Sequence, residues 1–125
     1  WKQMEQIRLG MKDNLNVNCY VNSCFSSYQM EQIRLGLIEG LDMSSYAKEK
    51  LGYDQLNQIR LGLLNNLDVS IYAKKDFNWT QMEQIRIGLE ENLDVSQYAN
   101  SDLNWWQMSD VRKKLLKEKE NRENE

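Results

Sequence analysis

The amino-acid sequence repeats itself every 26 residues. The phrase Gln-Met-Glu-Gln-Ile-Arg, or a close variant of it, begins at evenly spaced positions: Gln3, Gln29, Gln55, Gln81 and Gln107. No insertion or deletion disturbs this spacing, so the chain divides into four units and a terminal segment: 1–26, 27–52, 53–78, 79–104 and 105–125. A repeat of this length is typical of proteins in which each unit buries its apolar faces against its neighbours.

Each unit predicts a long helix with a defined start. For the long helix of the fourth unit, the preceding residue Asn78 is a favourable N-cap, and Gln81 lies three residues later, which is the spacing of a capping box. The apolar residues Phe77 and Met82 have the spacing of a hydrophobic staple around this cap. The same pattern recurs in the other units, with caps at Ser26, Gly52 and Asn104.

The predicted helix is about 13 residues long. Its apolar stripe consists of residues spaced by three or four positions: Trp79, Met82, Ile85 and Leu89. It is expected to stop at Asn92, since asparagine and glycine tolerate the left-handed conformation that follows a helix end. The leucine that follows this position in every unit is expected to pack back against the last turn, as in a Schellman ending.

A short second helix is predicted after each long one. Asp94 is its N-cap residue, and its apolar face consists of Val95, Tyr98 and Ala99. About six residues are too few for a helix that is stable by itself, so this segment must pack on neighbours. The sequence therefore predicts an all-α fold of tandem helix-turn-helix units, stacked as a small α-solenoid. The charged segment 105–125 is expected to form a C-terminal capping helix.

An arginine occupies the same position in every unit: Arg8, Arg34, Arg60, Arg86 and Arg112. It lies beside the apolar stripe, so it needs a partner or must extend towards solvent. The candidate partners are the glutamate three residues earlier and the aspartate before the second helix. We interpret the arginine as a structural tie between neighbouring units, and the alternative is a row of cations for an acidic ligand.

A glycine recurs in the middle of the predicted long helices: Gly10, Gly36, Gly62 and Gly88. A glycine in a helix costs about 1 kcal/mol relative to alanine. We therefore expect a repeated need for space, and the backbone of the neighbouring unit is the simplest candidate for what approaches. The last segment carries Lys114 at this position, where no further unit has to dock.

Two sets of aromatic residues recur. One set opens the long helix and the other lies in the short one: Trp1, Tyr53, Trp79 and Trp105, with Ser27 in the second unit, and Tyr20, Tyr46, Tyr72 and Tyr98. They pack the core and the contacts between units, or else they form an aromatic surface that grips a peptide or bases. Trp106 falls outside both sets and is a candidate contact residue.

The composition excludes several kinds of chemistry. The net charge of −3 gives no general attraction to nucleic acid or to anionic membranes, and no segment reads as a membrane span or a signal peptide. The chain has no histidine, which removes most zinc sites and the serine–histidine and cysteine–histidine pairs. We predict no catalytic residue, no metal and no cofactor. Cys19 and Cys24 are expected to be free thiols of a cytoplasmic protein.

The fourth unit carries most of the negative charge. Its acidic residues are Glu83, Glu90, Glu91, Asp94 and Asp102. They form a solvated face, or else they attract a basic protein partner. The candidate binding residues predicted from the sequence are therefore Trp106, Glu90 and Glu91.

The unit, with its Gln-Met-Glu-Gln-Ile-Arg-x-Gly-Leu and Leu-Asp-Val-Ser-x-Tyr-Ala motifs, resembles a short helical repeat. Such repeats occur in uncharacterised proteins of gut Gram-positive bacteria and of their mobile elements. The resemblance implies a helical array and a bacterial or phage source, and it implies no activity. Together with the composition, it favours a non-enzymatic scaffold that binds another protein. The alternative is a nucleic-acid-associated accessory protein of a mobile element.

Overall fold

The computed structural model describes residues 2–12, 26–43, 46 and 51–123, and these residues are all-helical, without a strand. The predicted all-α class is therefore confirmed. The long helices are α1 (Lys2–Lys12), α2 (Ser27–Ile38), α4 (Tyr53–Leu64), α5 (Trp79–Glu90) and α6 (Trp105–Glu123). Two short 3₁₀ turns follow α4 and α5: η2 (Val69–Ile71) and η3 (Val95–Gln97).

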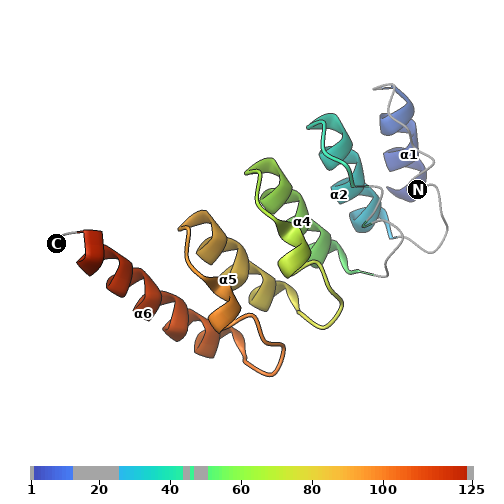
Figure 1. Ribbon diagram of the computed structural model, residues 1–125. Coiled ribbons are helices and arrows are strands. Elements are labelled where there is room, and N and C mark those ends of the chain that lie inside the picture. The colour runs from blue at the N-terminus through green and yellow to red at the C-terminus, as the bar shows by residue number, and fades with distance from the viewer. Residues whose placement is uncertain (1, 13–25, 44–45, 47–50, 124–125) are drawn as a thin grey trace.

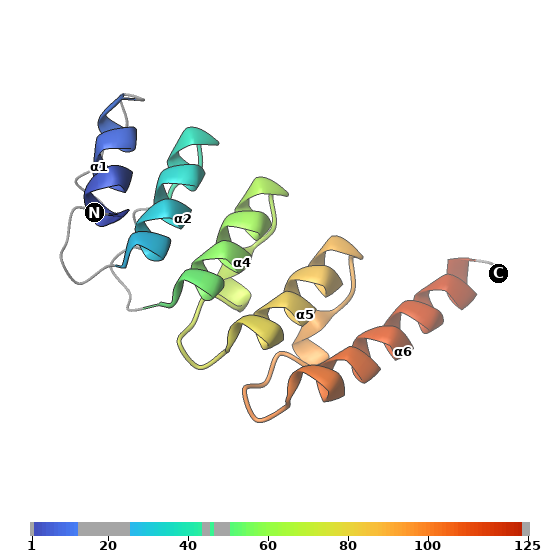
Figure 2. The ribbon, with the colours of Figure 1, turned by 180° about the vertical axis from the view of Figure 1, so that it is seen from behind.

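The long helices stand side by side in chain order and run in the same direction (Figures 1 and 2). Each packs against the one before it, from α1 and α2 to α5 and α6. The turns η2 and η3 pack on α4 and α5, on the side that faces the viewer in Figure 1. The opposite side of the row carries no such turn and is exposed in Figure 2.

The predicted helix starts are confirmed. The Asn78 side chain accepts a hydrogen bond from the Gln81 backbone at 2.9 Å, and the Gln81 side chain accepts one from the Asn78 backbone at 2.8 Å. Ser26 and Asn104 form the same reciprocal pair with the glutamine three residues later. Gly52 has no side chain, so only the half from Gln55 forms there, and the carboxylate of Asp54 accepts the Gln55 N–H instead.

The predicted helix ends are confirmed as well. The residue after each C-cap has a positive φ: +76° at Gly40 and +58° at both Asn66 and Asn92. After α5, the N–H of Leu93 donates to the Gly88 carbonyl at 2.9 Å, and the N–H of Asn92 donates to the Leu89 carbonyl. This is the pair of hydrogen bonds that defines a Schellman ending.

In the third and fourth units, the second helix is shorter than the sequence predicts. The N-cap is correct, because the Asp94 carboxylate accepts hydrogen bonds from the backbone and the hydroxyl of Ser96. Only three residues then follow in a 3₁₀ turn, since Tyr98 leaves the helical region with a φ of −135°. This change of direction lets the buried Tyr98 hydroxyl donate to the Gln84 carbonyl of α5 at 2.8 Å. Tyr72 binds Gln58 of α4 in the same way.

The repeated glycine makes room for this tyrosine, not for a neighbouring backbone. A Cβ at Gly62 would overlap the Tyr72 hydroxyl and lie 2.6 Å from Val69 Cγ1, both in the same unit. A Cβ at Gly88 would meet Tyr98 and Val95, and one at Gly36 would meet Met43. The expectation of a close approach between units is therefore wrong. Lys114 is tolerated in α6 because the helix continues there and no turn folds back on it.

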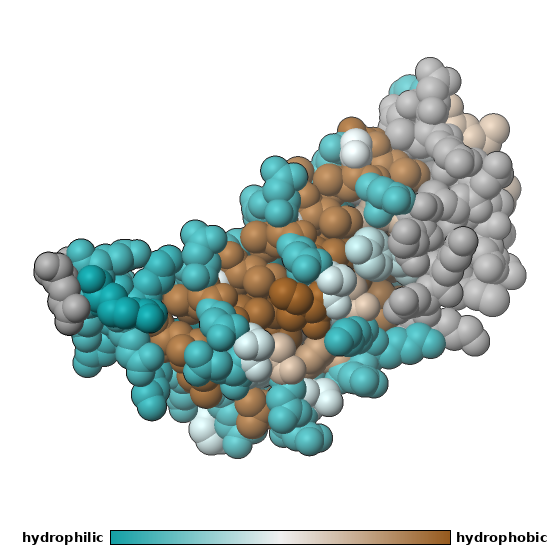
Figure 3. All heavy atoms as spheres, in the orientation of Figure 1, coloured by the Kyte–Doolittle hydropathy of each residue, from teal (hydrophilic) through white to brown (hydrophobic). Residues whose placement is uncertain are grey.

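The core lies between the long helices and the turns. Its fully buried side chains include Met30, Ile33, Met43, Leu56, Ile59, Tyr72, Met82, Ile85, Tyr98 and Met108. On the face shown in Figure 3, apolar side chains form a band over α2, α4 and α5, and α6 is mostly hydrophilic. That difference suits a helix whose outer side meets solvent.

A glutamine side chain joins the starts of α2, α4 and α5 to the segment that precedes the next long helix. While its Oε1 caps its own helix, the Nε2 of Gln29, Gln55 or Gln81 donates to the carbonyl of Leu51, Phe77 or Leu103, at 2.6 Å in each case. The accepting residue lies immediately before the N-cap of the next long helix, as Leu51 lies before Gly52. Each bond therefore joins two successive helix starts, and an amide side chain can both accept at its own cap and donate to that distant carbonyl.

We predict that Gln55→Glu destabilises the protein by about 1–3 kcal/mol, because a carboxylate cannot donate to the Phe77 carbonyl. Urea denaturation measures the loss, which should shrink below about pH 4, where the carboxyl group regains a proton. Gln107→Glu is the matched control. Gln107 caps α6 in the same way, but α6 is the last capped helix among the described residues. Equal losses in the two variants would contradict the link.

We also predict that Gly62→Ala destabilises the protein by about 1–3 kcal/mol through overpacking against Tyr72 and Val69. In the background of Tyr72→Phe the same substitution should cost less, because the overlapping hydroxyl is gone. A double-mutant cycle by urea denaturation measures this coupling. An unchanged midpoint for Gly62→Ala, or the same cost in both backgrounds, would show that the tyrosine does not require the glycine.

Candidate functional site

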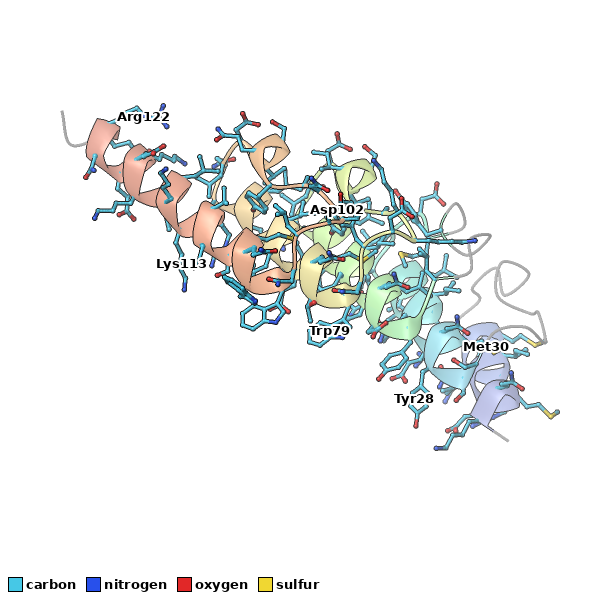
Figure 4. All side chains as sticks on the ribbon, turned by 90° about the horizontal axis from the view of Figure 1, so that it is seen from below. Tyr28, Met30, Trp79, Asp102, Lys113 and Arg122 are labelled. Carbon is cyan, nitrogen blue, oxygen red and sulfur yellow. The ribbon has the colours of Figure 1, made fainter. Side chains whose placement is uncertain are left out.

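Large aromatic side chains line one edge of the row of helices. They lie at the first or second position of a long helix and are 43–52% exposed: Tyr28, Tyr53, Trp79, Trp105 and Trp106. We call these residues the aromatic edge. In Figure 4, Tyr28 and Trp79 project from the same side of the row, and Asp102 lies on the other. The sequence places Trp79 in the buried stripe, and this prediction is wrong.

The position of these residues in the helix explains their exposure. The fully buried residues of α5 begin with Met82, three residues after Trp79. A helix turns by about 100° per residue, so the first two positions lie on the side away from that stripe. The other aromatic set behaves differently, because Tyr72 and Tyr98 are fully buried and burial raises the pKa of both hydroxyl groups. The two sets therefore divide between core and surface.

Neighbouring members of the edge contact one another. The ring centroids of Tyr28 and Tyr53 are 5.3 Å apart, with 40° between the ring planes. On the other side of Tyr28, the Lys2 ammonium lies 5.6 Å from the ring centroid, within the range of a cation–π interaction. The edge thus brings together side chains from α1, α2 and α4 that are separated by one unit in the sequence.

An open hollow of about 330 Å³ lies between Tyr53 and Trp79. Besides these two rings, it is lined by polar side chains of α2 and α4: Gln32, Asp54, Asn57 and Gln58. A second hollow borders Asp54 and Trp79 on the side of the loop before α5, where Lys75 and Asp76 contribute charged groups. Trp79 therefore has polar depressions on both sides.

The recurring arginines fix the polar side chains of the hollow. Arg60 Nε donates to Gln32 Oε1 at 3.1 Å, and Arg86 Nε donates to Gln58 Oε1 at 2.8 Å. The same link recurs at both ends of the row, from Arg34 to Gln6 and from Arg112 to Gln84. Each arginine therefore ties its helix to the preceding one, through a glutamine that the sequence did not single out.

Ion pairs complete these ties. Arg60 pairs with Glu39 and Arg112 with Glu91, at 2.7 Å in both cases, and each glutamate belongs to the preceding unit. In the third unit, Asn65 stands at the position that Glu39 and Glu91 have in the second and fourth units. There Arg86 pairs with Glu90 on its own helix at 2.7 Å, and Asn65 donates to the same carboxylate oxygen at 2.9 Å.

The partners expected from the sequence are therefore corrected. In the described ion pairs, Arg60, Arg86 and Arg112 bind Glu39, Glu90 and Glu91, and none of these is the glutamate three positions earlier or the aspartate before the turn. Asn57, which stands at that earlier position in α4, does accept a hydrogen bond from Arg60 at 3.0 Å. Asp68 and Asp94 cap their turns instead, and hydrogen bonds from Ser96 lower the pKa of Asp94.

The arginine ties decide which polar atoms the hollow can offer. The amide oxygens of Gln32, Asn57 and Gln58 all accept hydrogen bonds from Arg60 or Arg86. Their NH₂ groups are consequently the donors left for a ligand. Asp54 adds a carboxylate, one oxygen of which accepts the Gln55 N–H. The hollow thus combines aromatic faces, amide donors and one negative charge.

No family model, curated protein or solved structure matches the chain. In the described part of the chain, no cluster of three or more His, Cys, Asp or Glu side chains could hold a metal ion. None of the described helices is long and apolar enough to cross a membrane. The description of the site therefore rests on the geometry of this chain.

The candidate residues from the sequence do not come together. Trp106 is 52% exposed on the aromatic edge, at the start of α6. Glu90 and Glu91 lie at the far end of α5, where both take part in the arginine ties. Cys19, Cys24, Trp1 and Tyr20 lie outside the described residues. Sequence reasoning missed Tyr28, Gln32 and Asn57 as site residues, although the Gln-Ile-Arg phrase, which recurs in each of the four units, was a signal for a role of the glutamine.

We predict that Tyr53→Ser lowers the free energy of unfolding by less than about 1 kcal/mol, because half of the side chain is exposed and the second unit carries Ser27 at this position. Ile59→Ala, at a fully buried position of the same helix, should cost about 2–5 kcal/mol. Urea denaturation of both variants makes the comparison. Similar losses would mean that the aromatic edge is part of the core.

Proposed function

We propose that this chain is a non-enzymatic binding module that holds another protein at its aromatic edge. In this proposal its 26-residue units stack as a small α-solenoid, and the segment 105–125 caps the array. Helical arrays of this kind commonly bind partners along an extended surface. The assignment of a binding role to such an array is an argument from fold analogy, and the aromatic edge gives it a location.

The observation that carries the proposal is the repeated exposure of large aromatic rings along one edge. Tyrosine and tryptophan are enriched at the centres of protein interfaces, because they bury a large area and lose little conformational entropy. Core packing does not account for the large rings of Trp79, Trp105 and Trp106, because the buried stripe begins further along each helix.

Base stacking favours a second candidate, because aromatic side chains also bind single-stranded nucleic acids. Such sites combine the aromatic residues with a positively charged groove that follows the phosphates. Here the residues beside Trp79 include Asp54 and Asp76 with one cation, Lys75. The charges near the edge therefore favour a protein partner over an RNA or DNA strand.

Selection from a displayed peptide library tests the proposal. We expect peptides with a shared motif, whose affinity falls at least about tenfold when both Tyr53 and Trp79 are replaced by alanine. Leu64→Ala is the matched control, since Leu64 is 46% exposed at the other end of α4. Fluorescence anisotropy with labelled peptides measures the affinities.

Two outcomes would count against the proposal. Peptides that bind the double alanine variant as tightly as the parent would place the interface elsewhere. Preferential binding of single-stranded oligonucleotides, with an affinity that falls steeply with salt concentration, would favour the nucleic-acid alternative. Circular dichroism of the double variant verifies that the helices remain folded.

A further inference from the structure

Carboxylates without a cationic partner lie in the lining of the hollow between Tyr53 and Trp79 and on the two helices beside α4. Asp54 lines it directly. Glu31 and Glu83 occupy, on the neighbouring helices α2 and α5, the position that Asn57 has on α4. None of these three acids forms an ion pair within the described residues. This part of the edge therefore has negative charge that the protein does not neutralise through direct pairs.

The nearby arginines do not remove this excess. Arg60 and Arg86 have side chains only 16% and 15% exposed, and each is already paired with a glutamate at the far ends of the helices. Arg34, on α2, donates its Nε to Gln6 and is half-buried. Lys75 borders the second hollow together with Asp76. The charges that face solvent near Trp79 are thus predominantly negative.

The edge already accommodates a cation one helix away. The Lys2 ammonium lies over the ring of Tyr28, and that ring packs against Tyr53. Tyr28 and Tyr53 therefore present faces that a lysine side chain can cover. Between Tyr53 and Trp79, the same kind of surface borders an open hollow, with the Asp54 carboxylate in its lining.

We propose that this hollow binds a lysine or arginine side chain of an extended partner segment. This inference rests on the proposed function, and it specifies the chemistry of the partner. The rings of Tyr53 and Trp79 flank the aliphatic stem and attract the cationic end. Asp54 supplies the closest negative charge, and the amide NH₂ groups of Gln32 and Asn57 donate to main-chain carbonyls of the segment.

The helix dipole does not reverse this preference. The start of α4 carries a partial positive charge of about half a unit, which repels a cation. Asp54 lies at the second residue of α4 and offsets that charge with a full negative one. An anionic segment would instead be repelled by Asp54, which lines the hollow. The electrostatics of the hollow therefore select a basic residue.

The spacing of the helices sets the pattern of the partner. Packed helices lie about 8–10 Å apart, and an extended chain covers that distance in roughly three residues. A segment that places its basic residue between Tyr53 and Trp79 reaches Trp105 and Trp106 about three residues away. Because these two indoles are 52% exposed, an apolar residue suits that position.

Nuclear magnetic resonance of the indole N–H groups tests the inference. The probes are peptides of the form acetyl-Gly-Ser-Gly-X-Gly-Ser-Gly-amide, with lysine, arginine, norleucine or glutamate at X. We expect the lysine and arginine peptides to shift the Trp79 resonance, which a Trp79→Phe variant assigns. Norleucine keeps the apolar stem without the charge, so it should bind at least about fivefold more weakly.

Asp54→Asn removes the negative charge but keeps the local hydrogen bond, because the asparagine oxygen still accepts the Gln55 N–H. This variant should weaken the lysine peptide at least about threefold, and Glu118→Gln, which removes the same charge from the distant part of α6, should not. The inference fails if norleucine binds as tightly as lysine, if Asp54→Asn has no effect, or if Trp79 does not respond up to about 10 mM peptide.

The two proposals can fail separately. If the displayed library yields peptides that lack lysine and arginine but depend on Tyr53 and Trp79, the aromatic edge is a protein-binding site and the basic specificity is wrong. If the lysine peptide responds as expected and no library peptide depends on the edge, the hollow recognises a basic side chain and the function as a protein-binding module is wrong.

Discussion

The fold depends on a side-chain amide that serves two helices at once. At Gln29, Gln55 and Gln81, the glutamine accepts a hydrogen bond at its own helix start and donates another, at 2.6 Å, to the carbonyl before the next helix. Glutamate would satisfy the first role and fail at the second, because a carboxylate has no donor. A local cap thereby becomes a link between two successive helix starts and holds the neighbouring helices at one offset.

The arginine and tyrosine contacts accompany that offset. With neighbouring helices held at one offset, the recurring arginine of α2, α4, α5 and α6 reaches a glutamine of the preceding helix. Tyr72 and Tyr98 reach carbonyls of the long helix before their turn. The same offset aligns the first residues of the long helices along one edge. The exposed aromatic row is therefore a product of the packing, and any ligand that follows it meets one new helix for about every three residues.

Much of the fold could be predicted because its signals are local. Capping boxes, Schellman endings and turn caps depend on residues within six positions of one another, so Asn78, Gln81 and Asn92 indicate their roles directly. The length of the second helix could not be predicted, because the hydrogen bond from Tyr98 to a carbonyl fourteen residues away ends it. The need for space beside Gly62 was predicted from the sequence. The side chains that fill this space, Tyr72 and Val69, could not be predicted, because they depend on how the turn packs on α4.

The candidate site was less predictable than the fold. Periodicity counts Trp79 as an apolar residue of the stripe, and it cannot show that the first turn of the helix extends beyond the core. Trp106 is exposed, as a contact residue must be, but Trp105 at the repeated position is equally exposed, so lying outside the repeated positions does not distinguish it. In the sequence, Glu90 and Glu91 looked available to a partner protein. The arginines that pair with them lie four residues earlier on α5 (Arg86) and on the next helix (Arg112).

The exchange of partners around Asn65 makes the units unequal, so that removal of one is not equivalent to removal of the next. Loss of residues 53–78 would place Glu39 before Arg86, which also keeps Glu90, so this arginine would have two acids within reach. Loss of residues 79–104 would place Asn65 before Arg112, whose own helix has Leu116 where α5 has Glu90. That arginine would be left half-buried without a carboxylate. Deletion of residues 53–78 should therefore cost less stability than deletion of residues 79–104.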